Sequence, residues 1–472
     1  MNDPRQIQSP TRELAGWVSR LRYADLPPRT REVVRIVLLD TLGCGVYGYT
    51  TPWAKMLLKW ARPDAPGKGE ATVWGESAPS LRASDAALVN GTSVHAFELD
   101  DYHQAKLHPG AVVIPAAVAM AEKLGSTGEQ LVTAIAAGYE VMIRTSLALN
   151  PSAARLRGWH LTGVCGPFGA AAACASLMGL NEEQTAWALG LGGTQGAGLW
   201  AFNADGTMSK RLHAGKAAHS GVLAAELAQL GFTGPTQIYE FHDGGVLKAF
   251  SDASDPAPLT RDLGKVFHLD TISIKPYSCC GSTHSYVDAA LELRRKLGTP
   301  WDAKRPVRVG MAKVVDVQCG FDYVPSSALN AQMSLRYIVA AALTEGQALP
   351  PQFSDAKIAD PGLTAFARRI QCEHDPALDK LYPARFAAWV AAESNGKWER
   401  VDVLDPLGSS ANPVDAKGVV EKFRGINPQL AVDDVAKAVF DIERRPVKQV
   451  LDLLASARKG GGMRDEEQEN RK

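Results

Sequence analysis

Two long uncharged stretches, residues 162–180 and 184–204, are built mainly from Gly, Ala and Thr. A third run, residues 111–121, is almost entirely apolar. Small side chains allow helix backbones to approach one another closely, whereas bilayer spans are rich in Leu, Ile and Val. These stretches therefore predict tightly packed helices inside a protein, and they do not favour insertion into a membrane.

Helical spacing of apolar residues extends through the first 270 residues. No motif repeats with a period of about 20–50 residues, which argues against a solenoid. Three- and four-residue intervals between apolar side chains predict helices at about 13–23, 31–47, 52–61, 84–94, 111–124, 127–149, 166–178, 182–191 and 210–230. We therefore expect a large, almost all-helical domain over residues 1–270.

The sequence pattern changes near residue 271. The four residues Ser394-Asn395-Gly396-Lys397 predict a hairpin turn between strands at 386–393 and 398–403. Other strand candidates are 271–274, 305–317, 369–373 and 385–390, and helices are expected at 283–296 and 334–343. Residues 271–404 therefore predict a smaller α+β domain.

Helical patterns return near the C-terminus, at 414–423, 432–440 and 447–454. A chain of 472 residues is too long for one ordinary core, so at least two domains are expected. We predict a mainly α fold in which residues 1–270 and 405–456 build the helical domain and 271–404 form an inserted α+β lid. Residues 457–472 are expected to be a disordered tail.

Charge and cysteine content exclude several classes of function. The 51 Lys and Arg residues balance 51 Asp and Glu residues, which argues against nucleic-acid binding. The N-terminus lacks the pattern of a secretory signal, and the seven cysteines contain no C-x-x-C pair. A disulfide framework, a zinc site and an iron–sulfur cluster are therefore unsupported, and we expect a cytoplasmic protein. Adjacent Cys279 and Cys280 fit either buried thiols or a redox pair.

Ionisable residues concentrate between two apolar helices, within residues 95–108. Buried charges cost free energy unless they are paired or used, so this stretch is either an active-site wall or a solvated loop. A metal held here would fit no common zinc spacing, and we expect none. The residues concerned are His95, Glu98, Asp100, Asp101, Tyr102, His103 and His108.

Three histidines share one local setting. His108, His160 and His284 each lie next to a proline, threonine or serine that favours the start of a helix. The positive end of a helix attracts anions and lowers the pKa of a histidine. Each histidine alone is also explained by packing. Together with Lys210 and Arg211, the three predict a carboxylate-binding site capable of proton transfer.

The chain resembles the MmgE/PrpD family, the relatives of 2-methylcitrate dehydratase, cis-aconitate decarboxylase and iminodisuccinate epimerase. The resemblance extends over about residues 14–454 and is strongest at 38–43, 90–110, 158–169, 210–221 and 277–284. It implies a helical domain made from both chain ends, an α+β lid and a homodimer. It also implies an active site between the domains, which acts on short di- or tricarboxylates without an iron–sulfur cluster.

The same resemblance implies which residues form the site. Glu98 stands where the decarboxylase-like members have Asp, and Tyr102 stands where Thr is expected. Both changes add bulk, which implies a substrate smaller than cis-aconitate or of a different shape. Asp101 is a further substrate-binding candidate that either holds the helix end or orients His108. The implied active-site residues are Glu98, Tyr102, His108, His160, Lys210, His284 and Tyr337.

We expect a cofactor-independent hydro-lyase, like 2-methylcitrate dehydratase, that removes a proton next to a carboxylate. His160 and His284 are the expected acid/base pair with His108 in support, and Tyr337 is an alternative proton donor. Lys210 and Arg336 are expected to bind carboxylates. Alternatives are an epimerase of a dicarboxylate such as iminodisuccinate, a cis-aconitate-type decarboxylase and a non-catalytic carboxylate-binding scaffold. The expected partners are a small carboxylate and a second copy of the chain, without nucleic acid or membrane.

Overall fold

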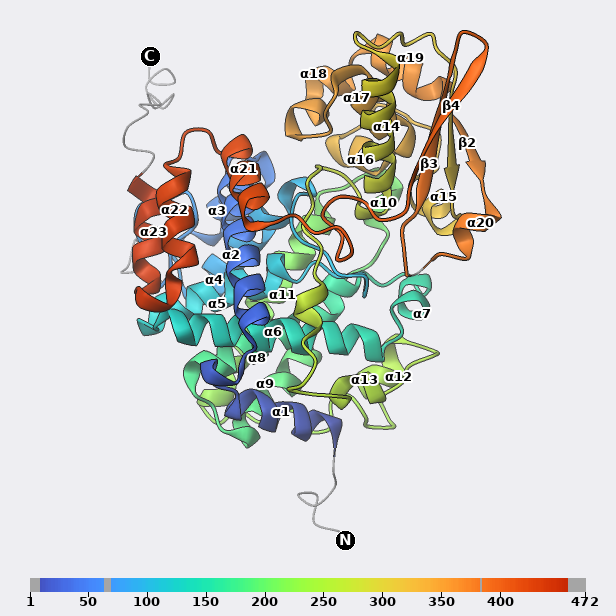
Figure 1. Cartoon of the computed structure of the whole chain (residues 1–472). Helices are drawn as coiled ribbons and strands as arrows, with labels where there is room; N and C mark the ends of the chain where they lie inside the picture. The colour runs from blue at the N-terminus through green and yellow to red at the C-terminus, as the bar shows by residue number, and fades with distance from the viewer. Residues whose placement is uncertain (1–8, 63–68, 383, 457–472) are drawn as a thin grey trace.

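The computed structural model describes residues 9–62, 69–382 and 384–456. Figure 1 shows a broad helical body and, above it, a smaller lobe that contains the sheet. The predicted fold class, mainly α with a small α+β part, is confirmed. The predicted disordered tail, residues 457–472, lies outside the described residues.

Most of the body comes from the first half of the chain. Its helices are α1 (Pro10–Arg20), α2 (Pro28–Gly48), α3 (Pro52–Ala61), α4 (Ala83–Val94), α5 (Gly110–Leu124), α6 (Gly128–Ala148), α7 (Pro151–Leu156), α8 (Leu161–Met178), α9 (Glu182–Gly193), α11 (Ser209–Gln229), α12 (Val246–Phe250) and α13 (Ala257–Thr260). The short helix α10 (Phe202–Asp205) instead places Phe202 in the core of the lobe. The helix predicted at 166–178 begins five residues earlier, at Leu161. Gly163 and Gly166 lie inside it, and their missing side chains leave room for the Ala197 carbonyl and the Ala217 methyl group.

Small residues make the centre of the body unusually close-packed. A Cβ placed on Gly138 of α6 would lie 2.7 Å from the carbonyl oxygen of Gly169 on α8, and the reverse distance is the same. Helices α6 and α8 are long and apolar enough to cross a membrane, but 94% and 89% of their apolar windows are buried inside the protein. The paired helices α2 and α3 also pass that test together, although they meet at 87°. Packing between helices therefore accounts for the apolar stretches.

The C-terminal helices return to the body. Helices α21 (Ala416–Ile426) and α22 (Val432–Phe440) pack on α2, and α23 (Val447–Ser456) packs on α5. Figure 1 shows the three beside α2–α5, away from the sheet. The ring of Phe423 lies so close to α2 that a Cβ on Gly43 would be 3.0 Å away. One hydrophobic core joins residues 14–274 with residues 414–454.

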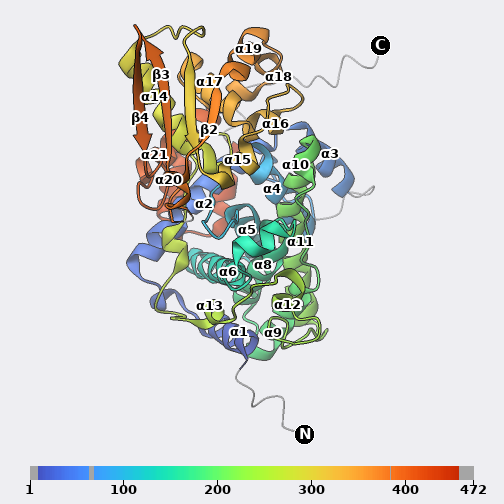
Figure 2. The ribbon, with the colours of Figure 1, turned by 90° about the vertical axis from the view of Figure 1, so that its right-hand side faces the viewer.

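The lobe has a second core and one sheet of order β2-β1-β3-β4. Strand β1 pairs in parallel with β2 and antiparallel with β3, which forms the predicted hairpin with β4 through Asn395 and Gly396. Helices α14 and α17 pack against each other, and α14 packs on β3 and β4 (Figure 2). The elements are β1 (Val307–Met311), β2 (Gln371–His374), β3 (Ala388–Ser394), β4 (Lys397–Val403), α14 (His284–Leu297), α15 (Lys313–Cys319), α16 (Ala328–Met333), α17 (Leu335–Glu345), α18 (Asp355–Ile358), α19 (Pro361–Arg369) and α20 (Pro376–Asp379).

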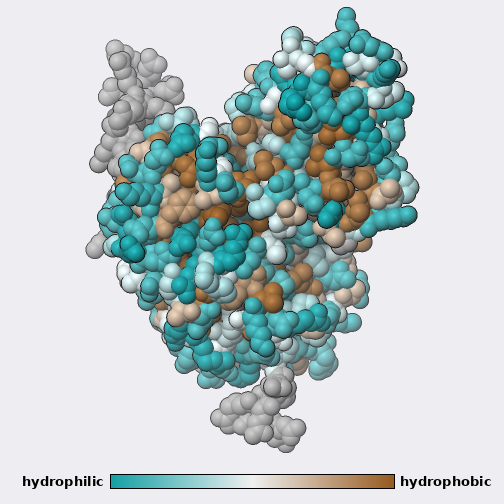
Figure 3. Space-filling model, in the orientation of Figure 1, coloured by the Kyte–Doolittle hydropathy of each residue, from teal (hydrophilic) through white to brown (hydrophobic). Residues whose placement is uncertain are grey.

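One predicted strand is too long, and another does not form. The strand predicted at 305–317 ends at Met311, and Lys313–Cys319 forms α15 because Val315 and Cys319, four residues apart, share one buried face. Residues 271–274 form no named strand; Ser273 pairs with Tyr102 in an isolated bridge. The surface in Figure 3 is mostly hydrophilic and is indented between the lobe and the C-terminal helices.

Candidate active site

A cleft of about 740 Å³, counting its open mouth, lies where the body meets the lobe. The loop between α4 and α5 contributes one wall, and the starts of α8 and α11 contribute another. Residues 280–282, just before α14, complete it from the lobe side. Side chains that line it and carry chemistry include Glu98, Tyr102, His108, His160, Lys210 and Lys275. Helix N-termini therefore surround the cleft, which favours an anionic ligand.

The wall between α4 and α5 is held in place by backbone bonds. Tyr102 donates its amide to the Ser273 carbonyl at 2.9 Å and accepts the Ser273 amide at 2.9 Å. Just before this bridge, Glu98 adopts a left-handed conformation, with φ 56° and ψ 33°. That conformation costs a non-glycine residue about 1–2 kcal/mol. The contacts of the Glu98 side chain offset this cost.

Glu98 forms ion pairs with two lysines. Lys210 donates to its Oε1, and Lys275 Nζ lies 3.1 Å from Oε2. Burial would raise the pKa of Glu98, but the two ammonium groups hold it well below its usual value. Burial lowers the pKa of Lys210 despite its contact with Glu98, whereas the carboxylates around Lys275 raise the pKa of that lysine. Lys210 and Lys275 therefore share Glu98 as their ion-pair partner, and the charge of Asp100 acts on both lysines as well.

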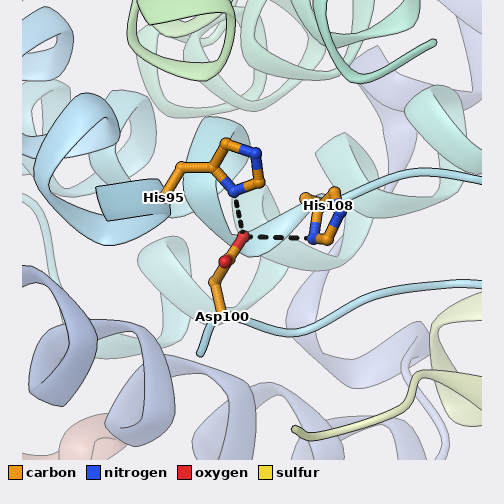
Figure 4. A group of neighbouring side chains, drawn as sticks. All are labelled: His95, Asp100 and His108. Carbon is orange, nitrogen blue, oxygen red and sulfur yellow. Dashed lines mark hydrogen bonds and ion pairs between the residues drawn. The ribbon is translucent and has the colours of Figure 1, made fainter. Parts of the chain in front are cut away.

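Asp100 orients two histidines at the back of this wall (Figure 4). Its Oδ2 lies 2.8 Å from His95 Nδ1 and 3.2 Å from His108 Nδ1. Burial would raise the pKa of Asp100, but both histidines hold it well below its usual value. Burial lowers the pKa of His95 to about 4. Because Nδ1 donates in both rings, Nε2 is the basic nitrogen of each neutral imidazole.

Within the described residues, His95, Asp100 and His108 are the group whose donor atoms lie close enough to hold a metal ion, all within 4.8 Å. His108 Nδ1 also lies 2.9 Å from the carbonyl oxygen of Asp101. A carbonyl accepts only from a protonated nitrogen, so Nδ1 carries its hydrogen and lacks the lone pair that a metal needs. At His108 Nδ1 the arrangement therefore favours hydrogen bonding over metal binding.

His160 is the N-cap residue of α8 and reaches the cleft. Its Nδ1 lies 3.0 Å from the Nδ1 of His213, and the ring is packed edge-on against Trp200 and Phe202. Burial, followed by the positive charge of Lys210, holds the pKa of His160 well below its usual value. The imidazole is therefore neutral at pH 7 and available for proton transfer.

Family models match almost the whole chain. The MmgE/PrpD N-terminal domain matches residues 12–259, and the MmgE/PrpD C-terminal domain matches residues 277–444. The chain belongs to the MmgE/PrpD family. The boundary between the two matches falls where the structure passes from the helical body to the lobe.

Named MmgE/PrpD relatives align over nearly their full length. The cis-aconitate decarboxylase-like protein oryM of Aspergillus oryzae is 30% identical, with 95% of each chain covered. The cis-aconitate decarboxylase of Aspergillus terreus is 29% identical, covering 94% of this chain and 95% of the relative. The cis-aconitate decarboxylase of Mus musculus is 27% identical, covering 98% and 95% respectively. Family and relatives together support a lyase-type enzyme that acts on a carboxylate.

The cleft brings together five of the residues predicted for an MmgE/PrpD site: Glu98, Tyr102, His108, His160 and Lys210. His284, the first residue of α14, lies beside Tyr102 and does not line the cleft. Burial lowers the pKa of His284 to about 3, and its Nδ1 has no hydrogen-bond partner among the described residues. Of the three predicted histidines, His108 and His160 therefore line the cleft and His284 does not. All three histidines do lie at or beside helix N-termini, as predicted.

Asp101 holds the start of α5 and does not face the cleft. Its carboxylate accepts hydrogen bonds from the Tyr139 hydroxyl at 2.7 Å and the Gly110 amide at 2.8 Å. Burial raises the pKa of Asp101 to about 7. A group enclosed in this way supports the wall and does not contact a substrate in the cleft.

Arg336 and Tyr337 lie away from the cleft, contrary to their predicted roles. Arg336 donates to the Ile370 carbonyl at 2.6 Å and lies 3.3 Å from Asp322. Tyr337 is fully buried and donates its hydroxyl to the Gln352 carbonyl at 2.6 Å. The reason is the orientation of α17, whose residues pack into the core of the lobe.

The sequence predictions missed several residues at the cleft. Lys275 is a charge inside an otherwise uncharged run, residues 271–287, and that isolation is a usable signal. His213 contacts His160 without lining the cleft itself, and it lies within residues 210–221, one of the stretches that carry the family resemblance. Arg155 and Trp200 carry no such signal, because only the fold brings them to the cleft.

Proposed function

We propose that this chain is a lyase that acts on a short di- or tricarboxylate by forming a carbanion next to a carboxylate. One observation carries the proposal: buried Lys210 and Lys275 lie on the same cleft as His108 and His160. Fixed ammonium groups stabilise the enediolate charge that develops on a substrate carboxylate. Imidazole groups beside them can accept and return a proton.

His108 is the better candidate for the base. Its Nδ1–H is held by Asp100 and the Asp101 carbonyl, which orients Nε2. His160, whose pKa is held well below its usual value, is a weak base. Lys210, whose pKa is lowered by burial, is the more acidic of the two lysines that contact Glu98. These assignments use only side chains that line the cleft.

Two reactions share this carbanion. In decarboxylation, a carboxylate leaves as CO2 and the electron pair passes into the remaining carboxylate before the carbon is protonated. In dehydration, the base removes a proton, the carbon–oxygen bond breaks, and the hydroxyl group takes a proton from an acid, for which Lys210 is the candidate, and leaves as water. The relatives from Aspergillus terreus and Mus musculus are cis-aconitate decarboxylases, which favours decarboxylation of a compound like cis-aconitate.

Dehydration of a hydroxylated substrate is the second candidate, supported by the crowding of the wall. The Tyr102 ring lies so close to Gly281 that a Cβ there would be 3.2 Å from it, and Glu98 engages both lysines. The cleft therefore has less room than it would have with Asp in place of Glu98 and Thr in place of Tyr102. Epimerisation, a homodimer and a cytoplasmic location stay predictions.

The proposal is tested by offering the protein cis-aconitate, 2-methylcitrate and shorter hydroxy-dicarboxylates. CO2 release reports decarboxylation, ultraviolet absorbance of a new conjugated double bond reports dehydration, and NMR detects deuterium taken up beside a carboxylate. We expect His108→Ala and His160→Ala each to reduce turnover at least about a hundredfold. His219→Ala, on α11 and outside the cleft lining, is the matched control.

Unchanged turnover in both histidine variants would refute these roles. Binding of a carboxylate by the native protein without turnover or deuterium uptake would instead identify a non-catalytic binding protein.

A further inference from the structure

Arg155 is a cleft residue without a partner for its charge. It lies near the end of α7 and lines the cleft. Its guanidinium carbon stacks 3.5 Å above the Trp200 ring. Its side chain forms no ion pair or hydrogen bond with any residue in the described part of the chain, and its Nε is buried without a partner.

A neighbouring arginine shows the ordinary alternative. Arg157, two residues later, is exposed and forms an ion pair with Asp252 at 2.9 Å. Arg155 is partly buried, and burial lowers its pKa to about 10 with no acidic residue to offset the effect. It is still charged at pH 7, so burial carries a free-energy cost, of which the contact with the Trp200 ring recovers only a part.

The surroundings of Arg155 indicate what would pair with it. The Trp200 indole contacts the guanidinium and also lies edge-on to the His160 ring, with 5.8 Å between ring centroids. The Trp200 ring therefore lies between Arg155 and His160, a proposed proton-transfer residue. Among the described residues that line the cleft, Glu98 is the single carboxylate, and it is already bound by Lys210 and Lys275. An anion for Arg155 must therefore come from the ligand.

We propose that Arg155, held flat on Trp200, binds a substrate carboxylate other than the one that Lys210 and Lys275 bind. A planar guanidinium matches a carboxylate through two parallel hydrogen bonds, which a lysine cannot form. The cleft then selects substrates with carboxylates at both ends of a short carbon chain, and it discriminates against substrates with only one carboxylate. The inference rests on the proposed function, because it completes the substrate-binding site of that enzyme.

The test measures binding by calorimetry, so that it does not depend on turnover. The probes are propane-1,2,3-tricarboxylate and its two analogues that lack one carboxylate, glutarate and methylsuccinate. We expect native protein to bind the tricarboxylate at least about tenfold more tightly than the analogue that lacks the carboxylate bound by Arg155. Arg155→Gln is expected to abolish this preference while leaving the affinity for that analogue unchanged. Arg155→Lys keeps the charge but loses the planar contact. Its preference for the tricarboxylate should therefore lie between those of the native protein and Arg155→Gln.

Arg157→Gln is the matched control and should bind all three probes like the native protein. Melting temperatures and circular dichroism of the variants establish that each is folded. Tricarboxylate binding that survives Arg155→Gln, an equal weakening for all three probes, or no binding of any probe to native protein would overturn the inference. Arg155-dependent binding without turnover of any substrate would refute the proposed function alone, and turnover without Arg155 dependence would refute this inference alone.

Discussion

The Nδ1 atoms of His160 and His213 lie 3.0 Å apart, so one hydrogen is shared between the two rings. Each ring is neutral at pH 7, because burial and then the charge of Lys210 lower the pKa of both. Whichever ring donates, the bond fixes the tautomer of His160 and hence the state of the nitrogen that faces the cleft. Gly198 makes room for this pair, since a Cβ there would lie 3.2 Å from His213 Nδ1.

His213→Phe keeps an aromatic ring but removes the partner of His160. We expect kcat to fall by about tenfold to a hundredfold, the usual cost of losing a residue that orients a reactive histidine, with little change in KM. His213→Asn retains a hydrogen-bonding group and should restore part of kcat. Steady-state kinetics across the pH range checks this, because a tautomer effect changes the pH profile of kcat whereas a packing defect changes the melting temperature. An unaltered kcat in His213→Phe would contradict it.

Local sequence signals predicted the parts of this site that local structure determines. His108, His160 and His284 were placed at helix starts by their neighbours in the chain, and the structure agrees. Arg336 and Tyr337 also lie at a helix start, but α17 turns them into the lobe. Which face of a helix meets the cleft depends on tertiary packing, which spacing along one helix does not specify.

Long-range pairings escaped prediction for the same reason. Lys275 reaches Glu98 across 177 positions of the chain, and Arg155 reaches the cleft through its stack on Trp200. The overall fold class was predictable because apolar periodicity extends over long segments. Residues 313–319 were misassigned because a short alternation of valines fits both a strand and a buried helix face.

His103 should make stability depend on pH in the acidic range. It is buried, and burial followed by the charge of His268 lowers its pKa to about 3. Below the unfolded pKa of about 6.5 the unfolded chain binds a proton that the folded chain does not, so the free energy of unfolding falls as pH decreases. We expect His103 to contribute a loss of about 1.4 kcal/mol per pH unit between pH 6 and 4.

Urea unfolding of the native protein and His103→Asn at a series of pH values checks this contribution. The difference between them at pH 8 measures lost packing and the lost hydrogen bond to Thr271. The difference should then shift in favour of the variant as pH decreases, because Asn cannot be protonated. Parallel stability curves down to pH 4 would contradict the expectation.

Lys422 connects the C-terminal helix α21 to the wall of the cleft. Its ammonium lies 2.6 Å from Asp40 and 2.5 Å from the carbonyl oxygen of Leu99, next to Glu98. Lys422→Met leaves the buried Asp40 carboxylate unpaired, so we expect a loss of about 3–5 kcal/mol in urea unfolding and lower turnover. Lys417→Met on the same helix, where the side chain is 83% exposed, should change stability by less than about 1 kcal/mol. Equal effects of the two variants would contradict this role.

Glu98 and Tyr102 together should determine which substrate the cleft accepts. Asp is one methylene shorter than Glu, so it cannot contact Lys210 and Lys275 in the same way, and it tolerates the left-handed backbone at this position. Replacing Tyr102 by Thr removes the ring that packs against Gly281 and widens the cleft. We expect the double variant Glu98→Asp, Tyr102→Thr to shift the ratio of kcat/KM values toward cis-aconitate, relative to shorter hydroxy-dicarboxylates, by about tenfold or more.

Two single variants serve as controls for that shift. Tyr102→Phe keeps the ring and should leave the ratio near its native value. Glu98→Gln removes the charge without shortening the side chain, so it leaves two buried ammonium groups without a carboxylate and should destabilise the fold by about 3–5 kcal/mol. If the double variant folds, binds carboxylates and still shows the native ratio, then these two residues do not set substrate size, and the discrimination must reside elsewhere on the cleft.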